Sequence, residues 1–273
     1  MTTLTADPAA QLAPTAAPVV TPHALRQWWA LSTRAMRGVV VNGEIILAFV
    51  SPAFLAVCFY LPLRNIMNIP GINYAQFLMP IIVLQSVAFT ATSAAMRSAL
   101  DRKSGITTRF ATLPMPTAVP PAARFSANIF LLAVSLVCGS IAVLIIGWRP
   151  GGGVTGTLAL IGIAALIGAC LMTIGDALGV IAPSPEVTSQ VLSLPILILG
   201  MISTGFAPAD KFPSWIRGFA ENQPISVWAE TMRHIDGVAQ APNRLGESLA
   251  WIGFLAAVSI TLILVAARMN RQR

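Results

Sequence analysis

The residues that most often carry chemistry are scarce and scattered in this chain. The two histidines, His23 and His234, stand alone, with no neighbours that would complete a metal site or a catalytic triad. The segment that begins at Gly151 has the glycine spacing of a phosphate-binding loop but lacks its lysine. Three cysteines lie inside apolar runs without a Cys-x-x-Cys spacing, which predicts inert buried thiols: Cys58, Cys138 and Cys170. The sequence therefore predicts no metal site and no enzyme activity in this chain.

One carboxylate stands inside an apolar run. Asp176 lies within residues 156–182, and an ionisable group at membrane depth is a candidate functional residue. It is about 20 residues from the outer end of that run, which is roughly 30 Å along a helix and close to the inner interface. There it can cap, pair with an arginine or meet water, so we favour a structural role. Glu44 and Glu186 lie only at the edges of runs, whereas an ion-coupled carrier would need a series of such groups at mid-membrane.

The composition indicates a membrane protein. Hydrophobic residues make up 56% of the 273 residues, charged residues make up 10%, and the mean hydropathy is +0.76. A soluble domain carries about 25% charged residues, so this chain has too few to cover a surface in water. Six apolar runs are long enough to cross about 30 Å of hydrocarbon as helices: residues 45–63, 77–95, 125–148, 156–182, 187–206 and 248–267. The sequence therefore predicts an all-α membrane protein with six transmembrane helices.

The basic residues predict the orientation. With the N-terminus inside, eleven of the 17 lysines and arginines fall in cytoplasmic segments and six fall outside. The long fifth connection, on the outside, is net acidic. Because positive charges gather on the cytoplasmic side, both termini are predicted to be cytoplasmic and the chain to be multi-pass in the plasma membrane. The same sorting accounts for the pI of about 10.4, so nucleic acid is not predicted as a partner.

The chain divides into a tail, an amphipathic helix and a transmembrane domain. Residues 1–22, rich in Ala, Pro and Thr, have no signal-peptide core and are predicted to be a disordered cytoplasmic tail. Residues 23–43 are predicted to form an interfacial amphipathic helix, because a tryptophan pair falls opposite three arginines at 100° per residue. A short soluble helix packed on other protein is the alternative. The transmembrane domain takes residues 44–273.

Two loops have patterns typical of docking or gating elements. Residues 101–124 are basic and cytoplasmic, and their prolines bound a short helix that could dock on a partner; a solvated charged loop is the alternative. Residues 206–235 hold two short amphipathic segments broken at Pro224, and Pro213 is well placed to start the first. They are predicted to form a re-entrant hairpin in the outer leaflet, shielded by protein or water.

These features make the chain similar to ABC-2 type permeases, especially the B-type membrane subunits of the daunorubicin/doxorubicin and phthiocerol dimycocerosate exporters of actinobacteria. The resemblance extends over residues 38–267. Short motifs carry it: Asn42-Gly43-Glu44, Leu84-Gln85-Ser86-Val87, Asp101…Gly105…Arg109-Phe110…Pro114-Met115, Leu194-Pro195-Ile196-Leu197-Ile198, and Phe212-Pro213-x-Trp215-Ile216…Asn222-Gln223-Pro224-Ile225-Ser226.

The resemblance implies an exporter of an amphipathic drug or a complex lipid. This chain would hold no cofactor; ATP and Mg²⁺ would bind a separate ATPase subunit, and a second permease subunit, a copy or a sibling, would complete the assembly in membrane lipid. The resemblance also implies a coupling helix toward the ATPase, with candidate residues Asp101, Arg102, Gly105, Ile106, Arg109 and Phe110. It implies a re-entrant outer gate, with candidate residues Phe212, Pro213, Trp215 and Phe219.

A substrate path is predicted at the interface between the two permease subunits. Small and apolar residues of the second and fifth spans would suit an amphipathic ligand there: Leu84, Ser86, Ser193 and Met201. Two other functions stay open. An ion-coupled secondary carrier would need more intramembrane charge and an inverted repeat. The other is a membrane-embedded enzyme or scaffold. A neighbouring ATPase gene would support the exporter, and its absence would favour one of these two alternatives.

Overall fold

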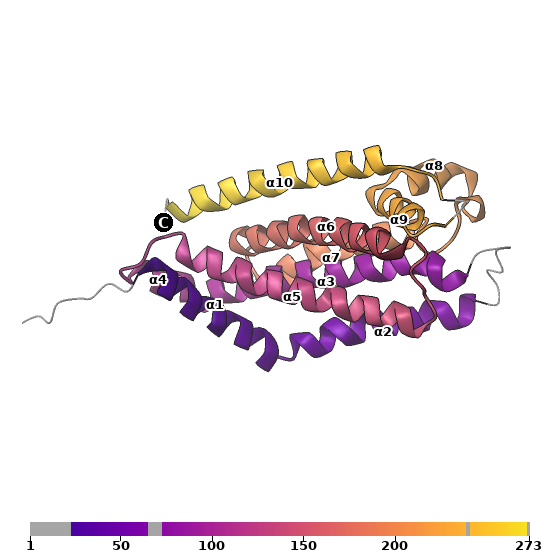
Figure 1. Ribbon diagram of the computed structural model, residues 1–273. Coiled ribbons are helices and arrows are strands. Elements are labelled where there is room, and N and C mark those ends of the chain that lie inside the picture. The colour runs from indigo at the N-terminus through magenta and orange to yellow at the C-terminus, as the bar shows by residue number, and fades with distance from the viewer. Residues whose placement is uncertain (1–22, 65–72, 239–240, 272–273) are drawn as a thin grey trace, which may run out of the picture.

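The computed structural model describes residues 23–64, 73–238 and 241–271, and every regular element in these ranges is a helix or a helical turn. The predicted tail at residues 1–22 lies outside them. Five helices are long and apolar enough to cross a membrane: α2, Glu44–Leu63; α3, Tyr74–Lys103; α5, Val119–Ile145; α6, Gly153–Ile181; and α10, Leu245–Arg271. They run side by side along one axis (Figure 1). The all-α membrane class is thus confirmed.

The predicted span at residues 187–206 is a shorter apolar helix. α7 comprises Pro185–Met201, and its 17 residues make it about 26 Å long. Ser184 caps its start, since the hydroxyl oxygen accepts a hydrogen bond of 3.3 Å from the Val187 N–H. The chain then turns through the buried residues Ser203 and Thr204 toward the next helices. α7 therefore ends before residue 206, by about one helical turn.

α3 is the central helix of the bundle. In its most apolar window 78% of the residues are buried, against 17% in α2 and 11% in α10. It packs against α5 and α6, and small residues bring α6 close. A Cβ added at Gly175 would overlap the carbonyl oxygen of Ala91 on α3, and one added at Gly179 would overlap that of Ala95. Glycine is therefore required at these two points of contact.

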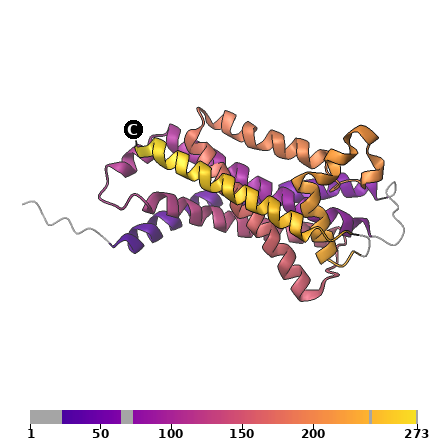
Figure 2. The same cartoon turned by 90° about the horizontal axis from the view of Figure 1, so that it is seen from above.

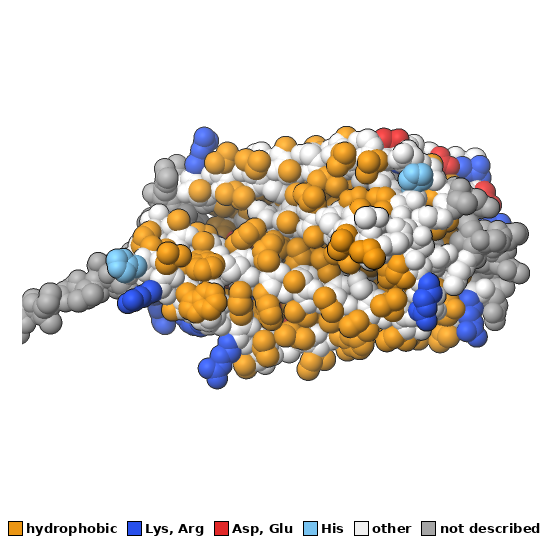
Figure 3. Space-filling model, viewed as in Figure 1, with side chains coloured by type: hydrophobic (Ala, Val, Ile, Leu, Met, Phe, Trp, Pro, Cys, Tyr) orange, Lys and Arg blue, Asp and Glu red, His pale blue; other side chains and the backbone are white. Residues whose placement is uncertain are grey.

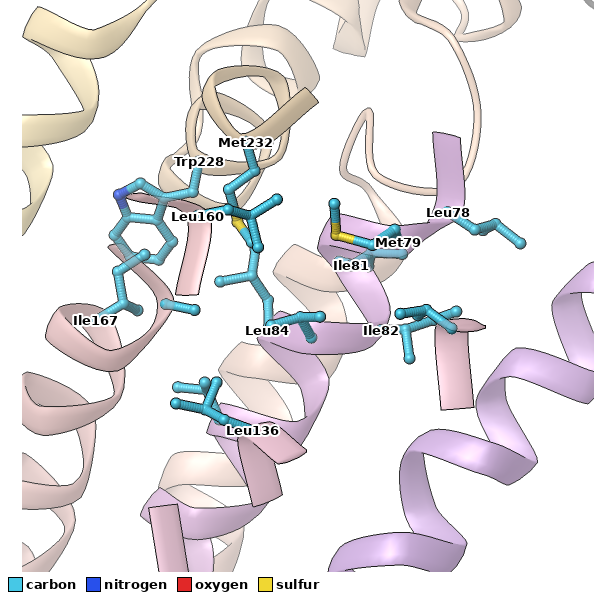
Figure 4. Packing of buried hydrophobic residues seen from close by; sticks show 14 of the residues in the cluster. Leu78, Met79, Ile81, Ile82, Leu84, Leu136, Leu160, Ile167, Trp228 and Met232 are labelled. Atoms are coloured by element: carbon cyan, nitrogen blue, oxygen red, sulfur yellow. The ribbon is translucent and has the colours of Figure 1, made fainter. Parts of the chain in front are cut away.

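The main hydrophobic core lies where α3, α5, α6 and α9 (Pro224–Ile235) meet. Figure 4 shows Leu160, Ile167, Trp228 and Met232 on one side of α3 and Leu78 and Ile82 on the other. The cluster includes Leu78, Met79, Ile82 and Leu84 of α3, Leu136 of α5, Leu160 and Ile167 of α6, and Trp228 and Met232 of α9. All of these residues are buried. The second half of the predicted hairpin is therefore part of the packed core.

α2, α7 and α10 form an outer layer with large exposed apolar side chains. Figure 3 shows hydrophobic side chains over the middle of one face, with charged side chains gathered at its two ends. Exposed examples are Phe54 on α2, Leu197 on α7 and Phe254 on α10. A surface of this kind is stable against lipid chains or another apolar protein surface, and not against water.

Short helices close the two ends of the bundle. At one end lie α4, Ile106–Ala111, the start of α1, Ala24–Val41, and the C-terminal part of α10 (Figure 1); we call this the α4 end. At the other end lie α8, Ser214–Asn222, and α9, preceded by the 3-10 turn Ala209–Lys211; we call this the hairpin end. Figure 2 shows α10 running across the bundle from one end to the other.

α1 packs along α5 and has three distinct faces. Its buried face includes Ser32 and Val39. Leu25 and Trp29 project outward with 75% and 63% of their surfaces exposed. A third face, including Arg34, lines a cavity described below. The predicted amphipathic helix is therefore present, and it packs against the transmembrane helices along much of its length.

Candidate functional site

A turn at Gly105 separates the end of α3 from α4. Gly105 has φ +69°, a left-handed conformation that glycine adopts without steric cost. The helix predicted within residues 101–113 is therefore confined to the six residues of α4. Asp101 and Arg102 belong instead to the last turn of α3.

The apolar face of α4 points into its own chain. Ile106 and Phe110 share this face, as their spacing of four residues predicts, and both are half-buried against a cavity. Arg109 is exposed on the other face, and Leu113, just after the helix, is also exposed. Of the predicted apolar anchors and charges, α4 therefore offers Arg109 to a partner and keeps Ile106 and Phe110 inside.

The cavity has a volume of about 320 Å³ and lies between α1, α3, α4, α5 and α6 at the α4 end. Its apolar lining comes from residues such as Leu31, Ala35 and Ala127. Charged and polar side chains also line it: Arg34, Asn42, Arg97, Asp101, Arg124, Asn128 and Asp176. A cavity that combines apolar walls with a few charged groups suits an amphipathic ligand.

Arg97, one of the arginines of the cavity, is held in place by polar partners. Arg97 of α3 forms an ion pair with Glu44, the first residue of α2. Its Nη2 also donates a hydrogen bond of 2.5 Å to Oδ1 of Asn128 on α5. These contacts join three helices around one guanidinium group, and they offset the free energy of removing its charge from water.

Asp176 of α6 pairs with Arg124 of α5. Oδ1 of Asp176 lies 3.3 Å from Nε of Arg124, and each side chain is about one-fifth exposed. The backbone oxygen of the same aspartate accepts a hydrogen bond of 2.9 Å from the Ser98 hydroxyl. The structure thus gives Asp176 one of the structural roles expected of it, pairing with an arginine.

Arg102 caps the end of α6. Its Nη1 donates hydrogen bonds of 2.8 Å and 2.7 Å to the backbone oxygens of Val180 and Ala182. The last carbonyl groups of a helix have no partner within the helix, so a guanidinium here satisfies two of them. This arginine therefore fixes α6 to α3. The sequence analysis considered Arg102 only as a charge that could meet the ATPase, and it missed this role.

At the hairpin end, two of the predicted gate residues lie on α8 and two lie just before it. Trp215 and Phe219 project outward with 82% and 54% of their surfaces exposed. Phe212 is half-buried, and its backbone oxygen accepts a hydrogen bond of 3.1 Å from Arg217. Pro213 occupies the cap position just before the helix, as its spacing predicts. The two aromatic rings are thus available to lipid or to another protein.

Arg233 of α9 is a buried charge that sequence reasoning missed. Its Nε and Nη2 donate hydrogen bonds of 3.0 Å and 2.8 Å to the backbone oxygen of Phe77, and Nη2 donates another of 2.9 Å to Gly205. The guanidinium carbon lies 3.6 Å from the centre of the Phe77 ring. Burial lowers the pKa of Arg233 to about 9, so the group stays charged at neutral pH. It ties α9 to the start of α3.

Asp236 fixes the end of α9 to the turn between α5 and α6. The Trp148 indole N–H donates a hydrogen bond of 2.8 Å to its Oδ2, and the Gly151 N–H donates one of 3.1 Å to its Oδ1. Burial raises the pKa of the Asp236 carboxyl, although these donors act in the opposite direction. An isolated Trp and an isolated Asp 88 residues apart gave no sequence signal of this contact.

The four residues predicted to line the substrate path do not share one surface. Leu84 and Ser86 of α3 are buried inside the chain, and Figure 4 shows Leu84 directed into the core. Ser193 and Met201 are exposed on α7. Within the described ranges, no three His, Cys, Asp or Glu side chains are grouped as a metal site would require.

Comparison with known proteins agrees with this architecture. The family model of the ABC-2 type transporter matches residues 26–236. The doxorubicin resistance ABC transporter permease protein DrrB of Mycobacterium tuberculosis (strain H37Rv) is 30% identical over 265 residues, which cover 89% of each chain. The daunorubicin resistance ABC transporter permease protein DrrB1 of Streptomyces coeruleorubidus is 26% identical over 202 residues, covering 72% of this chain and 68% of that protein. The chain therefore belongs to the ABC-2 type transporter family, as a multi-pass transmembrane permease subunit of an ABC exporter whose ATPase is a separate subunit.

Proposed function

We propose that this chain exports an amphipathic drug or a complex lipid across the plasma membrane, as one of two permease subunits that work with an ATPase. The observation that carries the proposal is its similarity, over 89% of its length, to a permease named for doxorubicin resistance. The related permease named for daunorubicin resistance points to the same class of compound. Both names refer to amphipathic compounds, which suit a permease whose outer helices expose apolar side chains.

The proposed topology has six membrane crossings with both termini in the cytoplasm. α7 is the sixth crossing: it is about 26 Å long, and its exposed side chains are apolar, as at Val191, Leu194 and Ile198. The N-terminus of α1 and the C-terminal part of α10 lie at the same end of the bundle (Figure 1). The excess of basic residues in the segments at this end supports its cytoplasmic placement.

The hairpin of α8 and α9 then lies at the outer side of the membrane. α9 is buried among the spans, and α8 turns Trp215 and Phe219 outward. Tryptophan is enriched at the bilayer interface, and phenylalanine is common on the apolar face of interfacial helices. We propose that α8 dips into the outer leaflet as a re-entrant gate.

Coupling to the ATPase is assigned to the outward face of α4. Arg109 and Leu113 are exposed there, so they offer a charge and an apolar side chain to a docking partner. On the inward face, Ile106 and Phe110 contact the cavity that α3, α5 and α6 also line. A displacement of α4 by the ATPase would therefore act on α3, which α4 contacts, and would change the shape of the cavity that α5 and α6 also line.

The second permease subunit is assigned to the exposed face of α7. Ser193 and Met201 lie on this face, and the substrate path would run between the two copies or siblings. Leu84 and Ser86 are buried inside the chain, so in this proposal they do not line the path and only stabilise the packing of α3.

A charge reversal on α4 tests the coupling assignment. Arg109→Glu should uncouple ATP hydrolysis from drug efflux in inverted membrane vesicles that contain the permease and its ATPase. Lys103→Glu is the matched control, because Lys103 is also an exposed cation at the α4 end but lies outside α4. Normal efflux by the Arg109 variant would place the docking site elsewhere, and the turn at residues 183–186 would be the next surface to test.

A further inference from the structure

The cavity at the α4 end holds two charged side chains that the described residues leave without a partner. Arg34 of α1 and Asp101 of α3 both line it. Within the described ranges, neither side chain makes an ion pair or a hydrogen bond, whereas Arg97 and Arg124 are both held by carboxylates. Among the described residues, the cavity therefore offers an exposed cation, Arg34, and a half-buried anion, Asp101, that no hydrogen bond holds, although Arg34, Arg97 and Arg124 all lie close enough to act on the Asp101 charge.

The cavity lies at the level of the membrane interface. α1 forms one of its walls and turns Leu25 and Trp29 outward on a different face, where they suit contact with lipid. The apolar span α2 starts only two residues after Asn42, another residue of the cavity wall, and its first exposed side chains are Ile46 and Leu47. Lipid headgroups are therefore the most concentrated molecules next to this cavity.

The charge balance of the lining selects among lipids. An anionic lipid such as phosphatidylglycerol would place its phosphate at Arg34 but has no positive charge to neutralise Asp101. A cationic amphiphile would match Asp101 and leave Arg34 facing a like charge. A zwitterion satisfies both groups at once, because its phosphate can accept from the guanidinium while its ammonium donates to the carboxylate.

A primary amine fits this site better than a quaternary one. Choline headgroups are bound by several aromatic faces, and Phe110 is the only aromatic side chain among the described residues of the lining. A primary ammonium has three N–H donors, which suit the Asp101 carboxylate. Apolar wall residues such as Leu31 and Ala35 can contact the glycerol and the first methylenes.

We propose that the cavity binds the headgroup of a phosphatidylethanolamine-type lipid, with its phosphate at Arg34 and its amine at Asp101. The leaflet is the one at the α4 end, which is cytoplasmic in the topology proposed above. Bound in this way, one lipid connects α1 to the end of α3 beside α4. The site is separate from the proposed substrate path on α7.

Lipid titration of the purified permease in detergent tests this site. Dihexanoyl phosphatidylethanolamine should raise the melting temperature saturably, because a ligand of the folded state stabilises it by mass action. Dihexanoyl phosphatidylglycerol and phosphatidylcholine should do so only at much higher concentrations. Arg34→Gln and Asp101→Asn should each weaken the phosphatidylethanolamine effect by about tenfold or more, as expected for the loss of one charge-assisted hydrogen bond.

Matched controls separate the site from general effects of charge. Arg37→Gln removes another exposed arginine of the same helix, and Glu186→Gln removes an exposed carboxylate near the same end; neither residue lines the cavity, so both should respond like the parent. Equal stabilisation by all three lipids, or an unchanged response in both cavity variants, would overturn the proposal. An equal effect of glycerophosphoethanolamine would overturn the lipid as the ligand in favour of a free phosphoester. No arm uses ATP or an ATPase, so the result is independent of the exporter assignment.

Discussion

At the scale of single residues, two arginines inside this membrane protein are each held by a defined set of polar groups. Arg233 donates to two backbone oxygens and stacks on Phe77, while Arg97 is held by Glu44 and Asn128. Removing one member of such a set leaves the other without compensation, and the penalty for that exceeds the net contribution of the intact pair. These side chains therefore fix how helices meet, and this packing role constrains their identity.

Asp236 gives a dependence of stability on pH with a defined sign. Burial raises the pKa of its carboxyl above the ordinary value of 3.8, so the folded state binds this proton more tightly than the unfolded state does. Its contribution to stability is full below that ordinary value and is lost as the pH rises through the raised pKa. The melting temperature of the parent relative to Asp236→Asn should therefore fall as the pH rises above 3.8.

Melting curves at a series of pH values, recorded for both proteins in the same detergent, measure this difference. Asp210→Asn, which removes an exposed carboxylate of the same end, controls for the loss of one charge. A difference that stays flat or grows with pH would contradict the assignment.

At the scale of elements, the close contact between α3 and α6 depends on glycine. A Cβ at Gly175 would overlap the carbonyl oxygen of Ala91, which belongs to the backbone and cannot move aside cheaply. Gly175→Ala should therefore destabilise the permease, typically by about 1–3 kcal/mol for overpacking. Gly162→Ala on the same helix should be neutral or stabilising, because no atom lies within 4 Å of a Cβ built there.

The melting temperatures of these two variants and of the parent, measured by thermal unfolding, test this prediction. The comparison is internal to one helix, so the higher helix propensity of alanine is the same in both. If Gly175→Ala melts with or above the parent, α3 and α6 do not approach as closely as described.

α8 offers a second test at this scale. Its exposed aromatic rings at Trp215 and Phe219 belong to no buried cluster, so replacing both with serine should leave folding and membrane levels near those of the parent. Efflux should drop if α8 forms the proposed gate. Trp228→Ser on α9 is the contrasting change: this tryptophan is buried in the main core, and its loss should lower membrane levels as well. Loss of membrane levels in the α8 variant would instead make α8 part of the folding core.

At the scale of the whole molecule, the source of energy is outside the chain. The sequence has no phosphate-binding loop with its lysine, and the family places ATP hydrolysis in a separate subunit. The purified permease in proteoliposomes should therefore hydrolyse no ATP, and efflux should appear only when the ATPase and ATP are added. Efflux by the permease alone, driven by an ion gradient, would support the carrier alternative and contradict the exporter proposal.

The sequence predicted much of this architecture because spans and caps are local properties. Apolar runs of about 20 residues, the amphipathic period before α2 and the break at Pro224 each depend on a few neighbouring residues. The end of α3 was harder: Asp101 and Arg102 were predicted to belong to the short docking helix, yet they form the last turn of α3, where Arg102 binds the end of α6. α7 was predicted too long because the apolar run continues into a turn.

Which distant segment a given helix face packs against could not be predicted from the sequence. Phe110 turns inward because α1 and α5 supply the other walls of its cavity, through Leu31 and Pro120. Arg233 finds its partners at Phe77, 156 positions away in the chain. A single sequence contains no information about which distant segments meet, so such residues are read as surface charge or docking anchors until the fold is known.

The unbroken length of α3 has a consequence for how its ends are related. Hydrogen bonds attach this helix to its neighbours near its start, where Arg233 binds the Phe77 oxygen, and near its end, where Arg102 caps α6. An α-helix turns about 100° and advances about 1.5 Å per residue. One residue inserted between these two attachment points would therefore rotate one end of the helix against the other by about 100°. Four inserted residues would restore the facing to within about 40° but lengthen the helix by about 6 Å. The number of residues in the middle of α3 is therefore constrained independently of their identity, since it sets the rotational phase between the two ends of the bundle.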